Sequence, residues 1–306
     1  MKVTTIGIDL AKNVLQVHGV DEQGKVTLRK QLRRSQVMDF FAQRAPCLVG
    51  MEACGSAHAW ARRLIKMGYT VKLMAPQFVK PYVKTNKNDA ADAEAIWEAC
   101  QRPQMRFVAV KSEEQQAVLS LHRIRQQFVK IRTMQAHQVR GLLYEFGAVV
   151  PKGGRALVAQ AGPVLADEMR CPAPELVRRE LLTQLEGLRT LTARITELDR
   201  QIGSWQRRES ECQRIAAVPG VGRLTATAVV ATIGDAKSFR SGREFAAFLG
   251  LVPRQSGTGG RVKLLGIRSD RGEVSLNDCL DFESLLEMRP SSADFIRATQ
   301  SRALQT

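Results

Sequence analysis

Residues 3–20 read VTTIGIDLAKNVLQVHGV, a run rich in β-branched side chains that decides the class of fold. It predicts two strands, at residues 3–8 and 14–20, and a turn at 21–24 then leads into a third strand at 26–28. Strands joined by such short connections pair antiparallel. The start of the chain therefore predicts an antiparallel meander.

Helices and strands alternate after the meander. The predicted elements are a helix capped by Ser35, a strand at 47–51, a helix at 56–67, a strand at 71–74 and a helix at 89–100 that Pro103 ends. The order βββαβαβ predicts a mixed sheet covered by helices, with ligand-binding groups at the strand ends. We expect a first domain over residues 1–110.

Two long amphipathic patterns, at 112–146 and 174–208, predict a helical middle region over residues 111–210. Apolar residues in the second recur at spacings of three and four. They are Leu181, Leu185, Leu188, Leu191, Ile195, Leu198 and Ile202. Such a seam fits a helical hairpin within the chain and equally a coiled-coil dimer interface. A third, small helical unit is expected over residues 211–267.

The charge balance points to a polyanionic partner. The chain has 306 residues, with 46 Lys and Arg against 30 Asp and Glu, and a net charge of +16. Such an excess favours nucleic acid, because cations that contact phosphates release counterions. The six cysteines include no C-x-x-C pair, so neither a zinc site nor a disulfide framework is expected. Without a signal peptide or a long apolar run, we expect a cytoplasmic protein with no membrane partner.

Four carboxylates stand where they could form a metal site. Asp9 and Glu52 each end a predicted strand, and Asp89 and Asp92 lie on one face at the start of a predicted helix. Divalent cations such as Mg²⁺ prefer oxygen ligands, and pairs of them assist phosphodiester cleavage. The same residues also suit a turn and a helix N-cap, so their spacing leaves both interpretations open.

Three stretches carry a resemblance to a known family. They are GIDLAK at 7–12, MEACG at 51–55 and NKNDAADAEAI at 86–96. In this order they resemble the blocks of the DEDD transposases of the insertion sequence 110 family. KSEEQQ at 111–116 and GLVPRQSGTGG at 250–260 extend the resemblance to about residues 1–267.

The resemblance implies a fold and a metal site. The fold is α/β plus α: an RNase H-like (RuvC-like) mixed sheet with helices, a helical or coiled-coil middle region, and a small helical C-terminal domain. Asp9, Glu52, Asp89 and Asp92 become the acidic tetrad that binds Mg²⁺ or Mn²⁺. The resemblance further implies a dimer or tetramer and a guide RNA encoded by the element.

The family resemblance also implies a serine nucleophile in the C-terminal domain, and here the candidate is Ser256. A serine in a glycine-rich loop presents an exposed hydroxyl near amides that can hold phosphate. The neighbouring glycines blur the alignment, so Thr258 is the alternative. Without the resemblance, a plain flexible turn would be the preferred explanation of these residues.

PGVG at 219–222 resembles the turn of a helix-hairpin-helix, whose backbone amides grip phosphates without reading bases. Gly220, Gly222 and Arg223 are therefore expected to contact nucleic acid, and Arg254 could add a contact. A tight helical corner is the alternative explanation, because a single PGVG is weak evidence.

Residues 268–306 depart from the family pattern. Where the family continues with a basic stretch, this segment has five arginines, seven acidic residues and no lysine, a net charge of −2. We interpret it as an atypical tail, and a frameshifted or truncated element copy is the simplest account.

These observations predict a DNA transposase that performs metal-dependent strand cleavage and exchange with Ser256 as nucleophile. Two other functions remain open. One is a RuvC-like, structure-specific DNA nuclease that uses water as nucleophile. The other is an inactive, DNA-binding remnant of a transposase.

Overall fold

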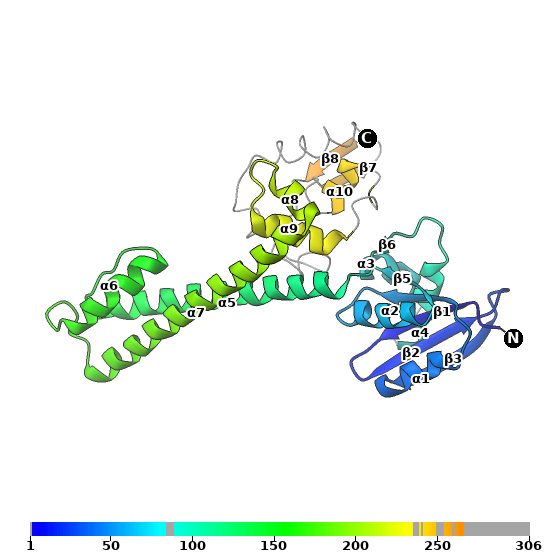
Figure 1. Ribbon diagram of the computed structural model, residues 1–306, viewed down its shortest axis with the longest axis horizontal. Coiled ribbons are helices and arrows are strands. Elements are labelled where there is room, and N and C mark those ends of the chain that lie inside the picture. Colours follow the sequence, from blue (N-terminus) through cyan, green and yellow to red (C-terminus); the bar gives the residue numbers. More distant parts are fainter. Residues whose placement is uncertain are drawn as a thin grey trace. The chain divides into compact units, whose positions relative to one another are not determined.

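The computed structural model describes residues 2–83, 89–234, 239, 241–248, 254–258 and 261–265 (Figure 1). The chain divides into two compact units. One comprises residues 1–116 and 231–278, and the other comprises residues 117–230 and 279–306. Within the described ranges, no helix combines the length and the apolar character needed to cross a bilayer. The atypical tail at 268–306 lies outside the described residues.

The first unit contains a six-stranded mixed sheet. Its strands are β1 (Thr5–Leu10), β2 (Val14–Val20), β3 (Val26–Arg33), β4 (Leu48–Glu52), β5 (Thr70–Met74) and β6 (Phe107–Val108). They lie in the order β3-β2-β1-β4-β5-β6. The β1–β4 and β4–β5 pairs are parallel and the other pairs are antiparallel. The predicted meander and mixed sheet are confirmed, although β3 runs to Arg33 and β6 was not predicted.

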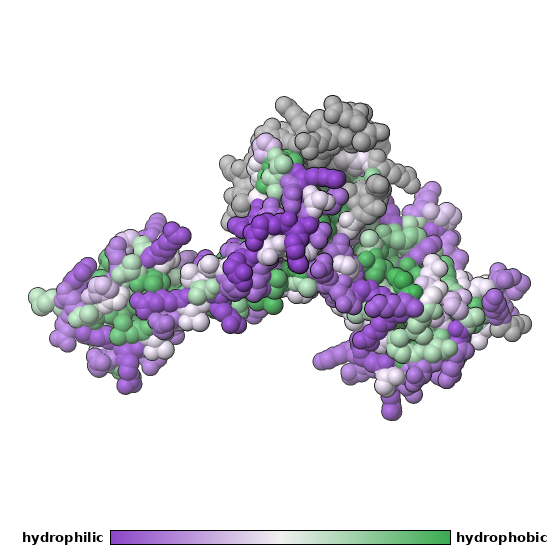
Figure 2. Space-filling view, viewed as in Figure 1, coloured by the Kyte–Doolittle hydropathy of each residue, from purple (hydrophilic) through white to green (hydrophobic). Residues whose placement is uncertain are grey.

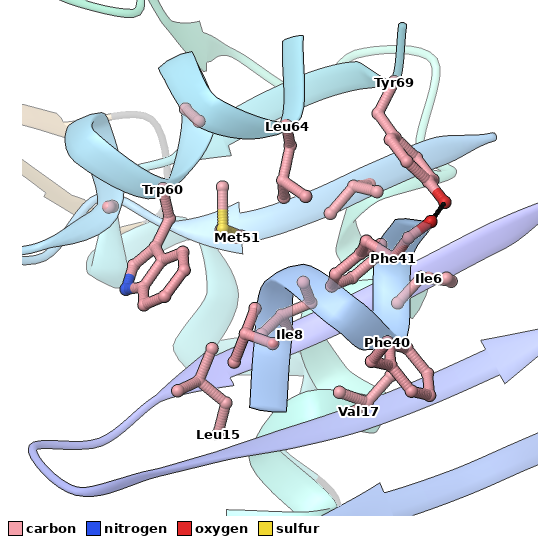
Figure 3. Packing of buried hydrophobic residues seen from close by; sticks show 14 of the residues in the cluster. Ile6, Ile8, Leu15, Val17, Phe40, Phe41, Met51, Trp60, Leu64 and Tyr69 are labelled. Carbon is pink, nitrogen blue, oxygen red and sulfur yellow. Dashed lines mark hydrogen bonds between the residues drawn. The ribbon is translucent and has the colours of Figure 1, made fainter. Parts of the chain in front are cut away.

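One face of the sheet packs against two helices and forms the main core (Figure 3). These helices are α1 (Val37–Ala42), which follows the short η1 (Arg34–Gln36), and α2 (Ala57–Lys66). Ile6 and Ile8 alternate along β1 with polar and small residues and are at most 1% exposed. The Tyr69 hydroxyl donates a 2.7 Å hydrogen bond to the Phe41 carbonyl oxygen, which satisfies this polar group inside the core.

The opposite face carries a second, smaller core. It lies against α4 (Asp89–Cys100), and α3 (Pro76–Val79) and η2 (Lys80–Tyr82) precede α4 in the chain. Met74 from β5 packs there with Ala95, Ile96 and Ala99. With α1 and α2 on one side and α4 on the other, both faces of the sheet are covered by helices, as predicted.

Long helices form the second unit. They are α5 (Glu113–Glu145), whose first turn belongs to the first unit, α6 (Gly154–Ala166) and α7 (Glu175–Arg208). Six of the seven residues of the predicted α7 seam are buried within the chain, and Leu191 is half-buried. Leu181, Leu185 and Leu188 pack in one cluster with Val139 of α5 and Leu157 of α6. The structure therefore shows the helical hairpin, and no pairing of two copies is needed to cover this seam.

The C-terminal part contains short elements. They are α8 (Ser210–Ala216), α9 (Arg223–Ile233), α10 (Gly242–Phe248), β7 (Arg254–Thr258) and β8 (Arg261–Leu265). A tight turn joins α8 to α9, and Gly220 adopts a φ of 85° there, a conformation that glycine adopts without strain. The β7–β8 hairpin was not expected in a helical domain.

Candidate active site

Asp9 and Glu52 lie at the carboxyl ends of two neighbouring parallel strands. Ile8 of β1 is paired in register with Met51 of β4, and the two carboxylates are the next residues along each strand. Side chains alternate between the faces of a sheet, and Ile8 and Met51 belong to the main core. The two half-buried carboxylates therefore lie on the opposite face, the one that α4 covers.

The backbone of α4 lies directly on β1 at Gly7. A Cβ atom added to Gly7 would clash with the carbonyl oxygen of Ala93 and lie 2.7 Å from the Trp97 nitrogen. At Gly50 on β4, an added Cβ would lie 3.0 Å from the Cβ of Cys100. The close approach of α4 to the sheet therefore depends on glycine at these two positions, and most strictly at Gly7.

The direction of α4 brings its first turn to the Asp9 end of β1. The Gln101 side chain, just beyond α4, donates a 3.1 Å hydrogen bond to Thr5 Oγ1, at the start of β1. Gly7 faces the middle of the helix, so α4 runs opposite to β1. Asp9 lies two residues beyond Gly7 along β1, and Asp89 lies four residues before Ala93 along α4. Both steps cover about 6 to 7 Å in the same direction, so the backbones of Asp9 and Asp89 reach the same level.

The structure thus places Asp9, Glu52 and the first turn of α4 together at the carboxyl ends of the central strands β1 and β4. Asp92 is half-buried, and Asp89 is the first residue of α4. Among the side chains that are described, no three His, Cys, Asp or Glu residues form a group that could hold a metal ion. The donor chemistry of these strand ends is nevertheless carboxylate oxygen, which suits a hard divalent cation.

Cys100 also lies on this face, and its burial disfavours the thiolate form. Burial raises the pKa of the Cys100 thiol, which packs beneath Gly50. The carboxylates are therefore the stronger ligand candidates on this side of the sheet.

Ser256 and Thr258 lie within β7, so the prediction that they lie in a glycine-rich loop was wrong. Both are exposed, and their register partners on β8 are Lys263 and Arg261. Arg254 is the first residue of β7. The hairpin forms a two-stranded sheet separate from the one that carries the carboxylates. An exposed hydroxyl on a hairpin is sterically open to a large substrate.

The α8–α9 turn contains the other residues predicted to bind nucleic acid. Gly220 lies in the turn and Gly222 directly precedes α9. Arg223, the first residue of α9, is exposed, and its guanidinium lies against Gly203 of α7. A Cβ at Gly203 would approach Arg223 Nη1 to 2.5 Å. The contact with α7 holds this arginine at the helix start.

The polar residues that lie beside the carboxylates on β2 and β3 were not predicted from the sequence. Gln16 is the register partner of Asp9, and Gln31 is the register partner of Gln16. The alternation of polar and apolar residues in both strands is visible in the sequence, but their alignment with Asp9 depends on the register.

Two regions of the chain match known transposase families. Residues 6–147 match the IS110-type DEDD transposase family, and residues 212–286 match the family described as "Transposase IS116/IS110/IS902 family". The second match includes residues 268–286, the first part of the segment whose charge departs from the expected pattern.

Several relatives are similar over most of the chain. A "Probable family 20 transposase" of Pseudomonas aeruginosa is 55% identical over 283 residues, which cover 92% of this chain and 82% of the relative. The "Transposase for insertion sequence element IS1328" of Yersinia enterocolitica is 42% identical, with 91% of this chain and 82% of the relative covered. The "Transposase for insertion sequence element IS1111A" of Coxiella burnetii is 40% identical, with 91% of this chain and 76% of the relative covered. With the strand-end carboxylates and the two family matches, these relatives show that the chain belongs to the IS110 family of insertion-sequence transposases.

Proposed function

We propose that this transposase cleaves and exchanges DNA strands in a reaction that requires Mg²⁺ or Mn²⁺, held by Asp9, Glu52, Asp89 and Asp92 in an RNase H-like domain of residues 1–110. The observation that carries the proposal is the meeting of two adjacent strand ends with the first turn of α4. DEDD-type transposase domains use divalent metal in general, and the match over residues 6–147 supports that chemistry here.

The residues of the site each have a defined task. The backbone positions of Asp9 and Glu52 are fixed in neighbouring strands of a buried sheet, so little reorganisation of the main chain is needed when a ligand binds. Asp89 and Asp92 belong to the first turn of α4, which the contact at Gly7 holds in place. When bound, the divalent ions neutralise the charge that develops on the scissile phosphate.

Ser256 is the proposed nucleophile. Its Oγ attacks the phosphorus of a DNA phosphodiester, a Ser256–phosphate ester bond forms, and the bond from phosphorus to one DNA oxygen breaks. The proton of the serine hydroxyl ends on the released DNA hydroxyl, so no other reactant is consumed. The exposure of Ser256 on β7 supports this role, and Thr258, two residues further on the same strand, remains the alternative.

Other contacts of the proposed complex lie in the remaining regions. The α8–α9 turn with Gly220, Gly222 and Arg223 acts as a helix-hairpin-helix that grips phosphates, and Arg254 adds a contact. Residues 111–210 support a dimer or tetramer and contacts with an element-encoded guide RNA, and residues 211–267 form the serine-bearing domain. The net charge of +16 supports nucleic acid as the partner.

The test is formation of a covalent protein–DNA adduct. The chain is incubated with element-end DNA, the candidate RNA and Mg²⁺, and adducts are separated by denaturing electrophoresis. We expect an adduct with the unmodified chain, its loss in Asp9→Asn and Glu52→Gln, and its retention in Asp39→Asn, an exposed carboxylate of α1. No adduct and no cleavage under any condition would refute the proposal.

Two serine-region variants separate the nucleophiles. Loss of the adduct in Ser256→Ala with retention in Thr258→Ala assigns Ser256, and the reverse assigns Thr258. Cleavage without an adduct that survives Ser256→Ala would indicate water as nucleophile and a RuvC-like nuclease. Salt-sensitive DNA binding without cleavage would indicate a DNA-binding remnant.

A further inference from the structure

Strands β2 and β3 extend the α4-covered face of the sheet beyond the carboxylates. Asp9, Gln16 and Gln31 are aligned across β1, β2 and β3 by the register of the two antiparallel pairs. Partners in antiparallel pairs point to the same face. A row of polar side chains therefore continues from Asp9 to the edge of the sheet.

The edge strand β3 is basic on this face. Arg29, Gln31 and Arg33 occupy alternate positions and are exposed. The residues between them point the other way: Leu32 is 2% exposed in the main core, and Lys30 Nζ lies 5.8 Å from the centre of the Phe40 ring. The strand thus presents two arginines on the same face as the carboxylates and a lysine on the opposite face.

A cavity of about 200 Å³ lies between this surface and the first half of α4. It is lined by residues 16–18 of β2 and 29–31 of β3 and by Ala90 and Ala93 of the helix. Small residues on α4 keep this space open. One of the arginines, Arg29, forms a 3.4 Å ion pair with Glu94, in which the arginine side chain is 66% exposed. A pair this exposed contributes little and can exchange for a phosphate.

We propose that Gln16, Arg29, Gln31 and Arg33, here called the β3 track, bind the phosphodiester backbone of the DNA strand that enters the acidic centre. This inference rests on the proposed function. A cluster of carboxylates repels DNA, so a strand must be held by cations and amides next to it. Guanidinium groups bind phosphate oxygens in two-point contacts, and amides donate single hydrogen bonds.

The spacing of the track fits an extended strand of nucleic acid. Alternate residues of a β-strand are about 6.6 to 6.8 Å apart, which is similar to the separation of successive phosphates along one nucleic-acid strand. The track runs along β3, and Gln16 connects it to Asp9. Contacts of this kind position the backbone and do not read the bases.

Charged residues on an edge strand have another possible role, which is to block sheet-to-sheet pairing between molecules. That role does not depend on which face the charge occupies. Lys25 directly precedes β3, and Lys30 lies on the opposite face of β3. Replacing these two lysines therefore provides a matched control with the same loss of charge.

The experiment compares Arg29→Gln/Arg33→Gln with Lys25→Gln/Lys30→Gln in the full chain. Binding of a fluorescent, single-stranded DNA of element-end sequence is measured by anisotropy across a salt series in EDTA, so that binding is separated from cleavage. Because two phosphate contacts on a single strand are removed, the slope of log affinity against log salt should fall by about 1.4 in the arginine variant. The lysine variant should keep the slope of the unmodified chain.

Three results would overturn the β3 track: an unchanged slope in the arginine variant, an equal fall in both variants, or no DNA binding by the unmodified chain. An RNA of the same sequence that binds more tightly than the DNA would overturn DNA as the ligand. A smaller slope in the arginine variant supports the track even if the unmodified chain forms no adduct and cleaves no DNA with Mg²⁺. That second outcome would refute only the proposed function.

Discussion

Single residues without side chains set the geometry of the candidate site. Gly7 lets the backbone of α4 contact β1, and Gly50 gives Cys100 and Met74 room beside β4. The two positions differ in what an added methyl group would meet. At Gly7 the obstacles include backbone atoms of α4, whereas at Gly50 they are side-chain atoms that can shift.

Gly7→Ala should therefore destabilise the fold more than Gly50→Ala. We expect a loss of about 3 kcal/mol for Gly7→Ala, because the helix must move off the strand, and about 1 kcal/mol for Gly50→Ala. Urea denaturation followed by circular dichroism measures both values. Equal losses would contradict the backbone contact at Gly7.

A buried histidine should make stability depend on pH. His122 of α5 is 8% exposed, and its Nε2 lies 3.0 Å from Thr227 Oγ1 of α9. The Thr227 hydroxyl donates to the Arg223 carbonyl oxygen, so its oxygen can accept a hydrogen from the imidazole. Burial, followed by the charge of Arg125, lowers the pKa of His122 from 6.5 to about 4.

Acidification should destabilise the chain through this group. Below its ordinary pKa of 6.5, the unfolded chain takes up a proton at His122 that the folded chain refuses until the pH approaches about 4. The free energy of unfolding should fall across this window by about 3 kcal/mol from His122 alone. Urea denaturation at several pH values should show a smaller fall in His122→Gln, whereas the exposed His137→Gln should match the unmodified chain. Identical pH dependence in all three proteins would exclude this origin.

At the residue scale, the sequence predicted the carboxylates better than their surroundings. Asp9 and Glu52 each come directly after a short, mostly apolar run. Such a run predicts a strand from local sequence alone, without knowledge of its partner strand. The alignment of Asp9 with Gln16 and the contact of Gly7 with Ala93 depend on register and helix direction. Such long-range facts are absent from local patterns.

Among the elements, strong periodicity was predictive and weak periodicity was not. The predicted long helices at 112–146 and 174–208 correspond closely to α5 and α7. In contrast, α6 begins after Gly153 and contains Pro163, so its sequence carries helix-breaking signals. Burial of Leu157 and Leu165 in the second unit offsets these signals. The two-residue strand β6 is too short to give any pattern.

The α7 seam provides a test at the scale of a helix. Leu185 is 1% exposed and packs with α5 and α6, while Leu182 of the same helix is 46% exposed. Leu185→Ala should lower the free energy of unfolding by about 3 kcal/mol, because it leaves a cavity in the core. Leu182→Ala should change it by less than about 0.5 kcal/mol. Urea denaturation compares the two, and similar values would mean that the seam is not buried within the chain.

For the whole molecule, the distribution of charge matters as much as its net value. Hydrophilic residues are spread over the visible face of the described residues, interrupted by apolar patches (Figure 2). In α5, residues 115–144 include no acidic residue and five basic ones: Arg123, Arg125, Lys130, Arg132 and Arg140. Arg125 forms a 2.6 Å ion pair with Asp199 of α7. Within α7, Arg189 and Arg200 each pair with an acid one turn earlier, with Glu186 at 3.0 Å and with Glu197 at 2.7 Å.

This contrast predicts which helix contributes to nucleic-acid affinity. Lys130→Gln/Arg132→Gln in α5 should weaken binding to duplex DNA and lower the salt slope by about 1.8, the value for two phosphate contacts. Arg189→Gln/Arg200→Gln in α7 removes the same charge from paired positions and should change the slope much less. Anisotropy titrations across a salt series measure both, and equal effects would show that only net charge matters.

The contact of α4 with β1 also bears on how freely this protein can diverge in sequence. Its closest point involves main-chain atoms and a residue with no side chain, so backbone atoms set the spacing of the helix from the strand at this point. Repacking of Ala95, Ile96 or Ala99 should therefore change thermal stability while leaving the metal requirement of cleavage unaltered. The distance between the carboxylate-bearing strand ends and α4 can stay the same while the sequence of the core changes.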